Sequence, residues 1–187
     1  LGEGRGEVEE RHGRYFAAFG DREVLDGLVV RHGSAWQQAV ARDLDNLVAA
    51  SRRAVGRGDG ACAGGAAVAA WAVLERQGPF SLGVLLLDEA AALRGPLRAT
   101  SLRHGGRARH LCGQPDEARV RYERALDEAR EAGDRCCEGR ALSQFGSLCL
   151  DLGQPHQALS HYEAALAISQ EVGDLLAMGV ALCGVGN

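Results

Sequence analysis

Apolar residues recur at helical spacing in the second half of the chain. Within residues 113–134, Ala118, Tyr122, Ala125 and Leu126 stand at positions i, i+4, i+7 and i+8. This spacing places the four side chains on one face of an α-helix and leaves the charged residues between them on the other face. The pattern therefore predicts an amphipathic helix in this segment.

The same pattern returns forty residues later. Residues 153–174 keep the same letter as residues 113–134 at eleven of twenty-two positions, and the small and aromatic positions are among those kept. Each copy has a proline at the expected first helical position, a glycine where a left-handed C-terminal residue is wanted, and an aspartate that can cap the next helix. These end markers are Pro115 and Pro155, Gly133 and Gly173, and Asp134 and Asp174.

The segment between the two copies predicts a second helix. Its apolar stripe consists of Leu142, Phe145, Gly146, Cys149 and Leu152. A helix pair with one apolar stripe on each member cannot bury both stripes alone, so a fixed period of this size predicts stacked pairs that share a core. The same signals divide the chain into pairs at 59–94, 95–133 and 134–173, with a fourth begun at 174–187.

The first part of the chain has a different pattern. We expect residues 1–58 to be a helical lead-in that closes the N-terminal end of the stack, and residues 59–187 to hold the repeats. Residues 1–6 lack periodicity and are expected to be mobile. Pro79 is expected to open a helix as Pro115 and Pro155 do. The stripe predicted for the lead-in helix is Trp36, Val40, Leu44, Leu47, Val48 and Val55.

The residues of the repeat resemble the tetratricopeptide repeat family. The likeness is carried by Leu142, Phe145, Gly146, Ala158, Tyr162 and Ala165, and one repeat earlier by Leu102, Gly106, Ala118, Tyr122 and Ala125. The forty-residue period resembles the longer-helix variety found C-terminal to bacterial signalling ATPases and regulators. The resemblance implies an all-α fold, a right-handed superhelix of antiparallel helix pairs.

Composition and charge narrow the choice of function. Aromatic residues make up only 5% of the chain and hydrophobic residues 46%, which suits closely packed helices built from Ala, Leu and Val. The net charge is −4 and there is no polybasic segment, so we expect no nucleic acid partner. No apolar run approaches the length of a membrane span, so we expect no membrane insertion.

The residues that could take part in catalysis or bind a metal do not form a recognisable motif. The chain has no lysine, which excludes a Walker loop and a Schiff-base lysine. The segment Gly58–Ala63 fits GxGxxA, but a predicted helix precedes it where a dinucleotide loop needs a strand. His110 and Cys112 diverge on a helix, and the six cysteines are expected to be structural thiols. We therefore expect no enzyme activity in this segment, no cofactor and no metal.

Two functions remain open. The first is a non-catalytic scaffold module that binds a protein or peptide and belongs to a larger cytoplasmic protein. The second is the regulatory helical-repeat sensor region of a multidomain signalling ATPase, kinase or transcriptional regulator. In either case the partner is expected to be a protein or peptide, with an acidic peptide as one candidate, or another domain of the same chain.

The binding groove is expected on the first helix of each pair, beside the core stripe. In its first part the expected lining is basic, and Arg can grip carboxylates with two hydrogen bonds, so an acidic peptide is the natural ligand; the alternative is that these arginines are solvated surface. The expected groove residues are Arg103, Arg107, His110, Arg140, Ser143, Ser147, Leu150 and Asn187.

The end of the chain carries a separate expectation. The sequence does not begin with Met and stops inside the helix predicted after Asp174, which suggests a segment of a longer protein. The apolar stripe of this last helix, Leu182 and Val185, is expected to lack a partner helix. We expect fast hydrogen exchange there and a tendency to self-associate.

Overall fold

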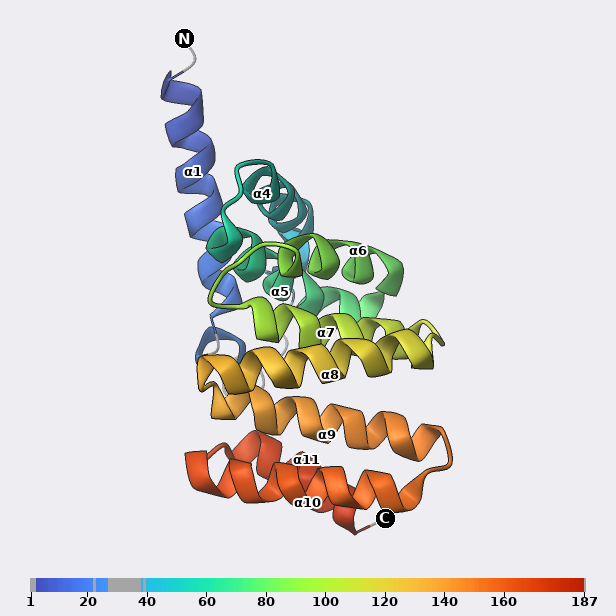
Figure 1. The fold of residues 1–187 in the computed structure, drawn as a ribbon. Helices are drawn as coiled ribbons and strands as arrows, with labels where there is room; N and C mark the ends of the chain where they lie inside the picture. Colours follow the sequence, from blue (N-terminus) through green and yellow to red (C-terminus); the bar gives the residue numbers. More distant parts are fainter. Residues whose placement is uncertain (1–2, 22, 27–37, 39, 187) are drawn as a thin grey trace. The chain divides into compact units, whose positions relative to one another are not determined.

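The structure is a computed structural model that describes residues 3–21, 23–26, 38 and 40–186. Its elements with defined bounds are all helical, and no strand occurs in these ranges. They are α1 (Glu3–Ala17), the short 3-10 helix η1 (Ala18–Gly20), α4 (Leu44–Gly56), α5 (Gly60–Gln77), α6 (Phe80–Ala91), α7 (Arg98–Leu111), α8 (Pro115–Ala132), α9 (Arg135–Asp151), α10 (Pro155–Val172) and α11 (Leu175–Val185) (Figure 1). The predicted all-α fold of tetratricopeptide-like helix pairs is confirmed.

The chain forms two compact units, Leu1–His104 and Gly105–Asn187. The boundary lies inside α7, whose first half belongs to one unit and whose second half belongs to the other. The division predicted from the repeat period, into 1–58 and 59–187, is a different one and stays a prediction.

The first unit is built around α5. Nearly every residue of α5 from Gly60 to Leu74 is buried, and α1, η1, α4 and α6 all pack against it. Its Gly and Ala residues let the neighbours come close: a Cβ at Gly65 would lie 2.5 Å from the carbonyl oxygen of Ala17. On the α6 side the indole of Trp71 lies against Gly83. A helix with side chains this small can be enclosed on all sides.

The buried face of α4 differs from the predicted stripe. Val40 and Leu47 are buried as expected, but Val48 and Val55 are only half-buried, and Trp36 lies outside the described residues. The face that meets α5 is completed by Ala50, Ser51 and Ala54. Small residues are favoured here because α5 is itself lined with Gly and Ala, and the Ser51 hydroxyl donates to the Ala63 carbonyl oxygen at 3.3 Å. The prediction from hydrophobicity alone therefore rotated the buried face of α4 away from the observed one.

Residues 3–6, expected to be mobile, form the first turn of α1, and their mobility stays a prediction. One further expectation about the first unit is wrong in detail. Pro79 is not the first helical residue, because its backbone is extended and α6 begins at Phe80. The helix is there, but it starts one residue later than the proline pattern of the later repeats suggested.

The second unit contains the end of α7 and helices α8 to α11, in which α9 packs against α8, α10 and α11 (Figure 1). The predicted stripes of α8 and α10 are buried, apart from Leu166, which is half-buried. Each pair is joined by a contact between an aromatic ring and a glycine. A Cβ at Gly106 would lie 2.7 Å from the ring of Tyr122, and one at Gly146 would lie 3.0 Å from Tyr162.

The predicted helix ends of the second unit are confirmed. Helices α8 and α10 begin at Pro115 and Pro155, and Gly133 and Gly173 have φ values of 66° and 72°, which are left-handed. The Asp134 carboxylate accepts the backbone N–H of Cys137 at 2.9 Å. Asp59 and Asp174 cap α5 and α11 in the same way. These caps satisfy backbone donors that the first helical turn leaves unpaired.

The last helix is buried on one side only. Ala177 and Ala181 are buried, and the backbone of Gly184 lies against the ring of Tyr162. Leu182 and Val185, the stripe predicted to lack a partner helix, are both exposed. The small residues of α11, rather than its leucines, therefore form its contact with α9 and α10.

Candidate peptide-binding face

One narrow stripe of α9 reaches the surface of the second unit. Between Cys137 and Cys149, all residues are buried except Arg140, Gln144 and Ser147, and the stripe continues at the half-buried Leu150. The spacing of four, three and three residues keeps these side chains on one face of the helix. Because α8, α10 and α11 cover the other faces, this stripe is the surface that α9 offers to a ligand.

Helix α7 has the same arrangement forty residues earlier. Thr100, His104, Arg107 and His110 are half-buried, while the residues between them are buried. Only Arg107 and His110 belong to the same compact unit as α9. The forty-residue repeat therefore applies to the half-buried surface residues as well as to the buried core residues.

The sequence located most of these two stripes, with two errors of phase. Arg140, Ser147 and Leu150 lie on the α9 stripe, and Arg107 and His110 lie on the equivalent stripe of α7. The other three expected groove residues do not: Arg103 is only 6% exposed, Ser143 is only 3% exposed, and Asn187 lies outside the described residues. The stripe residues that the sequence reasoning missed are Gln144 and His104, each one position after an expected residue. Ser143 and Gln144 are both polar, and so are Arg103 and His104. Polarity alone therefore could not show which residue of each pair reaches the surface.

Arg140 is held by a buried carboxylate. Its Nε donates to Asp174 Oδ2 at 2.7 Å, and the side chain of Asp174 is almost fully buried. Burial raises the pKa of Asp174, but hydrogen bonds from Arg140, the Ala177 N–H and the Cys136 thiol outweigh it and lower that pKa to about 2. Arg140 therefore ties α9 to the start of α11, and its charge is already balanced within the protein.

Ser147 and His110 are also engaged in contacts between helices. The Ser147 hydroxyl lies 2.9 Å from the Tyr162 hydroxyl. His110 Nε2 lies 2.7 Å from Asp151 Oδ2, and the Asp151 side chain is 70% exposed. The second contact joins α7 to α9 at the surface, where a ligand carboxylate could replace Asp151.

Gln144 is different, because its side chain has an unused acceptor. The carboxamide Oε1 is buried and has no hydrogen-bond partner within the described part of the chain. A buried acceptor without a partner costs about 1–3 kcal/mol. Gln144 is therefore the stripe residue whose hydrogen-bonding capacity a ligand would complete.

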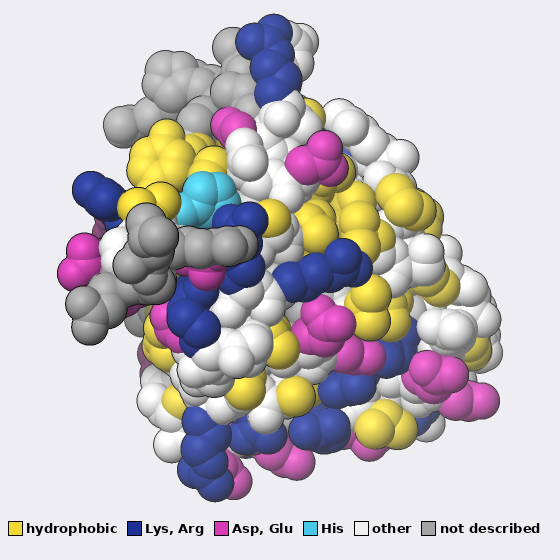
Figure 2. Space-filling view, turned by 90° about the horizontal axis from the view of Figure 1, so that it is seen from above, with side chains coloured by type: hydrophobic (Ala, Val, Ile, Leu, Met, Phe, Trp, Pro, Cys, Tyr) yellow, Lys and Arg dark blue, Asp and Glu magenta, His cyan; other side chains and the backbone are white. Residues whose placement is uncertain are grey.

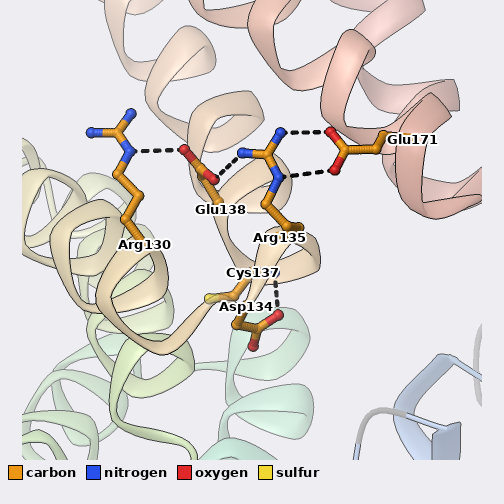
Figure 3. Close-up of polar contacts among 6 residues, drawn as sticks. All are labelled: Arg130, Asp134, Arg135, Cys137, Glu138 and Glu171. Carbon is orange, nitrogen blue, oxygen red and sulfur yellow. Dashed lines mark hydrogen bonds and ion pairs between the residues drawn. The ribbon is translucent and has the colours of Figure 1, made fainter.

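A second polar cluster lies at the opposite end of α9 and joins three helices (Figure 3). The buried carboxylate of Glu138 accepts from Arg130 Nε at 2.8 Å and from Arg135 Nη1 at 2.5 Å. Arg135 also donates to both oxygens of Glu171 on α10, at 3.3 and 2.7 Å, which lowers the pKa of Glu171. Since the two arginines face two carboxylates, this cluster is a structural tie between α8, α9 and α10.

Nothing in the described ranges points to catalysis or metal binding. No group of three His, Cys, Asp or Glu residues in those ranges could hold a metal ion. Burial raises the pKa of the Cys62 thiol to about 11 and also raises that of Cys149, so neither is a ready nucleophile. On the face seen in Figure 2, basic and acidic side chains are interspersed with apolar ones, without the uniform basic surface typical of nucleic-acid binding. Within the residues searched, no helix is both long and apolar enough to cross a bilayer.

Comparison with known proteins identifies the repeats. Residues 97–186 match the family model of the tetratricopeptide repeat. This part of the chain therefore belongs to the tetratricopeptide repeat family, which confirms the resemblance seen in the sequence. Repeats of this family are non-catalytic modules that mediate protein–protein interaction. A search of curated proteins found no match for the chain.

Proposed function

We propose that the chain is a non-catalytic scaffold module that binds a protein or peptide along the α9 stripe. The ligand would contact Arg140, Gln144, Ser147 and Leu150, with Arg107 and His110 of α7 at its edge. The stripe combines one apolar side chain with hydrogen-bonding groups, which suits an extended peptide whose backbone needs partners. The expected lining by Ser143 is not part of this proposal, because that residue is buried.

The observation that carries the proposal is the unpaired carboxamide oxygen of Gln144. It lies in the one stripe of α9 that is not buried from Cys137 to Cys149, and it can accept an N–H of a bound peptide. Forming that bond would satisfy an acceptor that is already desolvated, so its formation costs less than for an exposed group. Leu150, six residues further along the helix, supplies an apolar contact on the same face.

The experiment is a peptide selection followed by titration. Peptides selected from a random phage-displayed library against the 1–187 chain would be titrated against Gln144→Ala and against Gln170→Ala, an exposed glutamine on α10. We expect Gln144→Ala to weaken binding by about tenfold, equivalent to about 1.4 kcal/mol, and Gln170→Ala to leave it unchanged. Equal affinities for both variants and the parent, with helicity preserved, would rule out the α9 stripe as the site.

We further propose that the module works in the cytoplasm as part of a larger protein, where its partner is a separate protein or another domain of the same chain. All six cysteines are unpaired thiols, which supports a reducing compartment. An intramolecular partner would be found by cross-linking the full-length protein and mapping the linked peptides to the α9 stripe. Links only between different chains would favour a separate protein.

A further inference from the structure

Arg119 of α8 has no acidic partner, although two carboxylates are close to it in the sequence. Asp116 and Glu123 stand three residues before and four residues after it, at the spacing of helical ion pairs, yet Arg119 forms an ion pair with neither. Its guanidinium lies over α9, with Cζ 5.5 Å from the centre of the Phe145 ring. Its Nη2 donates to the neutral carboxamide oxygen of Gln154 at 3.1 Å. No carboxylate of the described ranges therefore balances the charge of this half-buried arginine.

His161 of α10 lies against the same aromatic ring. Its imidazole stacks on Phe145 with a centroid distance of 4.5 Å and an interplanar angle of 17°. The side chain is half-buried, and in the described part of the chain its ring nitrogens make no hydrogen bond. Burial lowers the pKa of His161, and the positive charge of Arg119 lowers it further. The imidazole is therefore neutral at pH 7, with one N–H to donate.

Packing in the second unit holds these two side chains in place. Helix α9 packs against both α8 and α10, and all three helices belong to the same compact unit. The Phe145 ring is only 5% exposed, and Tyr122 of α8 also stacks on it, at a centroid distance of 5.8 Å. Arg119 and His161 thus have a rigid base, and a ligand that accepts from them loses little side-chain entropy on binding.

We propose that Arg119 and His161 form a phosphate-binding site beside Phe145, which does not belong to the α9 stripe. A phosphate group can accept from a guanidinium and an imidazole at once, and its two negative charges match Arg119 and a protonated His161. A single carboxylate would be balanced by Arg119 alone. The same chemistry serves free phosphate and a phosphorylated side chain of a partner protein, since both present several acceptor oxygens.

An NMR titration of the 1–187 chain with sodium phosphate, at constant ionic strength, tests the site. We expect saturable shifts of the His161 ring signals, and a rise of the pKa of His161 towards its ordinary value when phosphate is bound. Arg119→Gln should weaken phosphate binding by about tenfold or more. In phosphate-free buffer the same variant should raise the pKa of His161, because a nearby positive charge is removed.

Two matched variants control for charge and for the loss of an imidazole. Arg124→Gln, at an exposed arginine of α8, makes the same change of charge as Arg119→Gln and should leave phosphate binding unchanged. His161→Gln should weaken phosphate binding, whereas His156→Gln, at an exposed histidine of α10, should not. Circular dichroism checks that each variant keeps its helices, and the His161 signals of the parent chain report on the site without any substitution.

A phosphoserine tripeptide, its unphosphorylated form and acetate distinguish the possible ligands. Binding of the phosphopeptide at least about tenfold tighter than inorganic phosphate would assign the site to a phosphorylated protein, and a smaller difference would assign it to free phosphate. The unphosphorylated peptide should not shift the His161 signals. The proposal would be overturned by a phosphate titration that does not saturate, by acetate that binds as tightly as phosphate, or by equal losses in Arg119→Gln and Arg124→Gln.

Discussion

The ring of Tyr162 lies directly against the backbone of Gly184. A Cβ at Gly184 would be 2.5 Å from the ring atom Cε1, closer than non-bonded carbon atoms can approach. The same ring also lies against Gly146 on the other helix of its own pair, and its hydroxyl contacts Ser147. Tyr162 is therefore a common contact point for α9, α10 and α11, and glycine is required wherever a helix crosses it.

Two glycines of α11 should respond to substitution in opposite directions. Gly184→Ala should destabilise the protein by about 1–3 kcal/mol, because the added methyl group overlaps a buried ring that has no room to move. Gly179→Ala should stabilise it by about 0.5–1 kcal/mol, because the site is open and Ala favours helix. Urea unfolding measures both. Destabilisation by both variants would mean that α11 is packed differently.

Neighbouring residues of α10 should differ as strongly. Ala158 is fully buried, so Ala158→Leu should overpack the core and cost about 1–3 kcal/mol. Leu159 is exposed, so Leu159→Arg should change stability by less than about 0.5 kcal/mol. Thermal melts followed by circular dichroism compare the two. A greater loss for Leu159→Arg would reverse the assigned helix face.

The two acidic residues of the Glu138 cluster should not contribute equally. Glu138→Gln removes a buried negative charge that accepts from Arg130 and Arg135, and should cost about 1–2 kcal/mol. Glu171→Gln should have little effect, since its carboxylate is exposed and water can replace it. Urea unfolding at 0.1 and 1 M NaCl distinguishes them, because salt screens the exposed Arg135–Glu171 pair more than the contacts of the buried Glu138 carboxylate. Equal losses of stability in the two variants would mean that Glu171 contributes as much to the cluster as Glu138.

Asp174 should give the protein an acid-sensitive contact. Its pKa is about 2 when folded, against 3.8 for an unperturbed aspartate, so the unfolded chain binds more protons between these values. The contribution is complete above about pH 5 and is lost as the pH falls through about 2. Asp174→Asn should be less stable than the parent by about 1–2 kcal/mol at pH 7, allowing for partial screening, with the difference shrinking towards pH 2.

Asp127→Asn, on the exposed side of α8, makes the same change of charge and serves as the control for Asp174. Unfolding free energies measured between pH 2 and 7 should show no comparable convergence for this variant. A constant difference between Asp174→Asn and the parent over that range would contradict the assignment of the low pKa to Asp174.

If the proposed site along α9 and the edge of α7 prefers acidic peptides, the affinity for such a peptide should depend on the salt concentration and on Arg107. We expect an acidic peptide to bind more weakly in 0.5 M than in 0.1 M NaCl, and Arg107→Ala to weaken it by about tenfold. Arg124→Ala, an exposed arginine on α8, controls for net charge. A preference for neutral peptides would contradict this expectation. Equal losses of affinity in Arg107→Ala and Arg124→Ala would contradict it as well.

The sequence alone determined the repeat, the positions of the helices in the second unit and most of the half-buried stripe residues of α7 and α9. It could do so because Pro115, Pro155, Gly133 and Gly173 act through the backbone of their own turn, which requires no knowledge of distant residues. The spacing of Ala158, Tyr162 and Ala165 is likewise a local property of one helix.

Tertiary structure decided which side of each helix is buried when several sides are plausible. In α4 the buried face is formed by Leu47 with Ala50, Ser51 and Ala54, and Val48 and Val55 are only half-buried, because α5 is rich in Gly and Ala and packs closely against small side chains. In α9 the choice between Ser143 and Gln144 depended on helices packed from three directions. Burial follows from shape complementarity between elements distant in sequence, and a helical period read from one segment does not contain the shape of its neighbours.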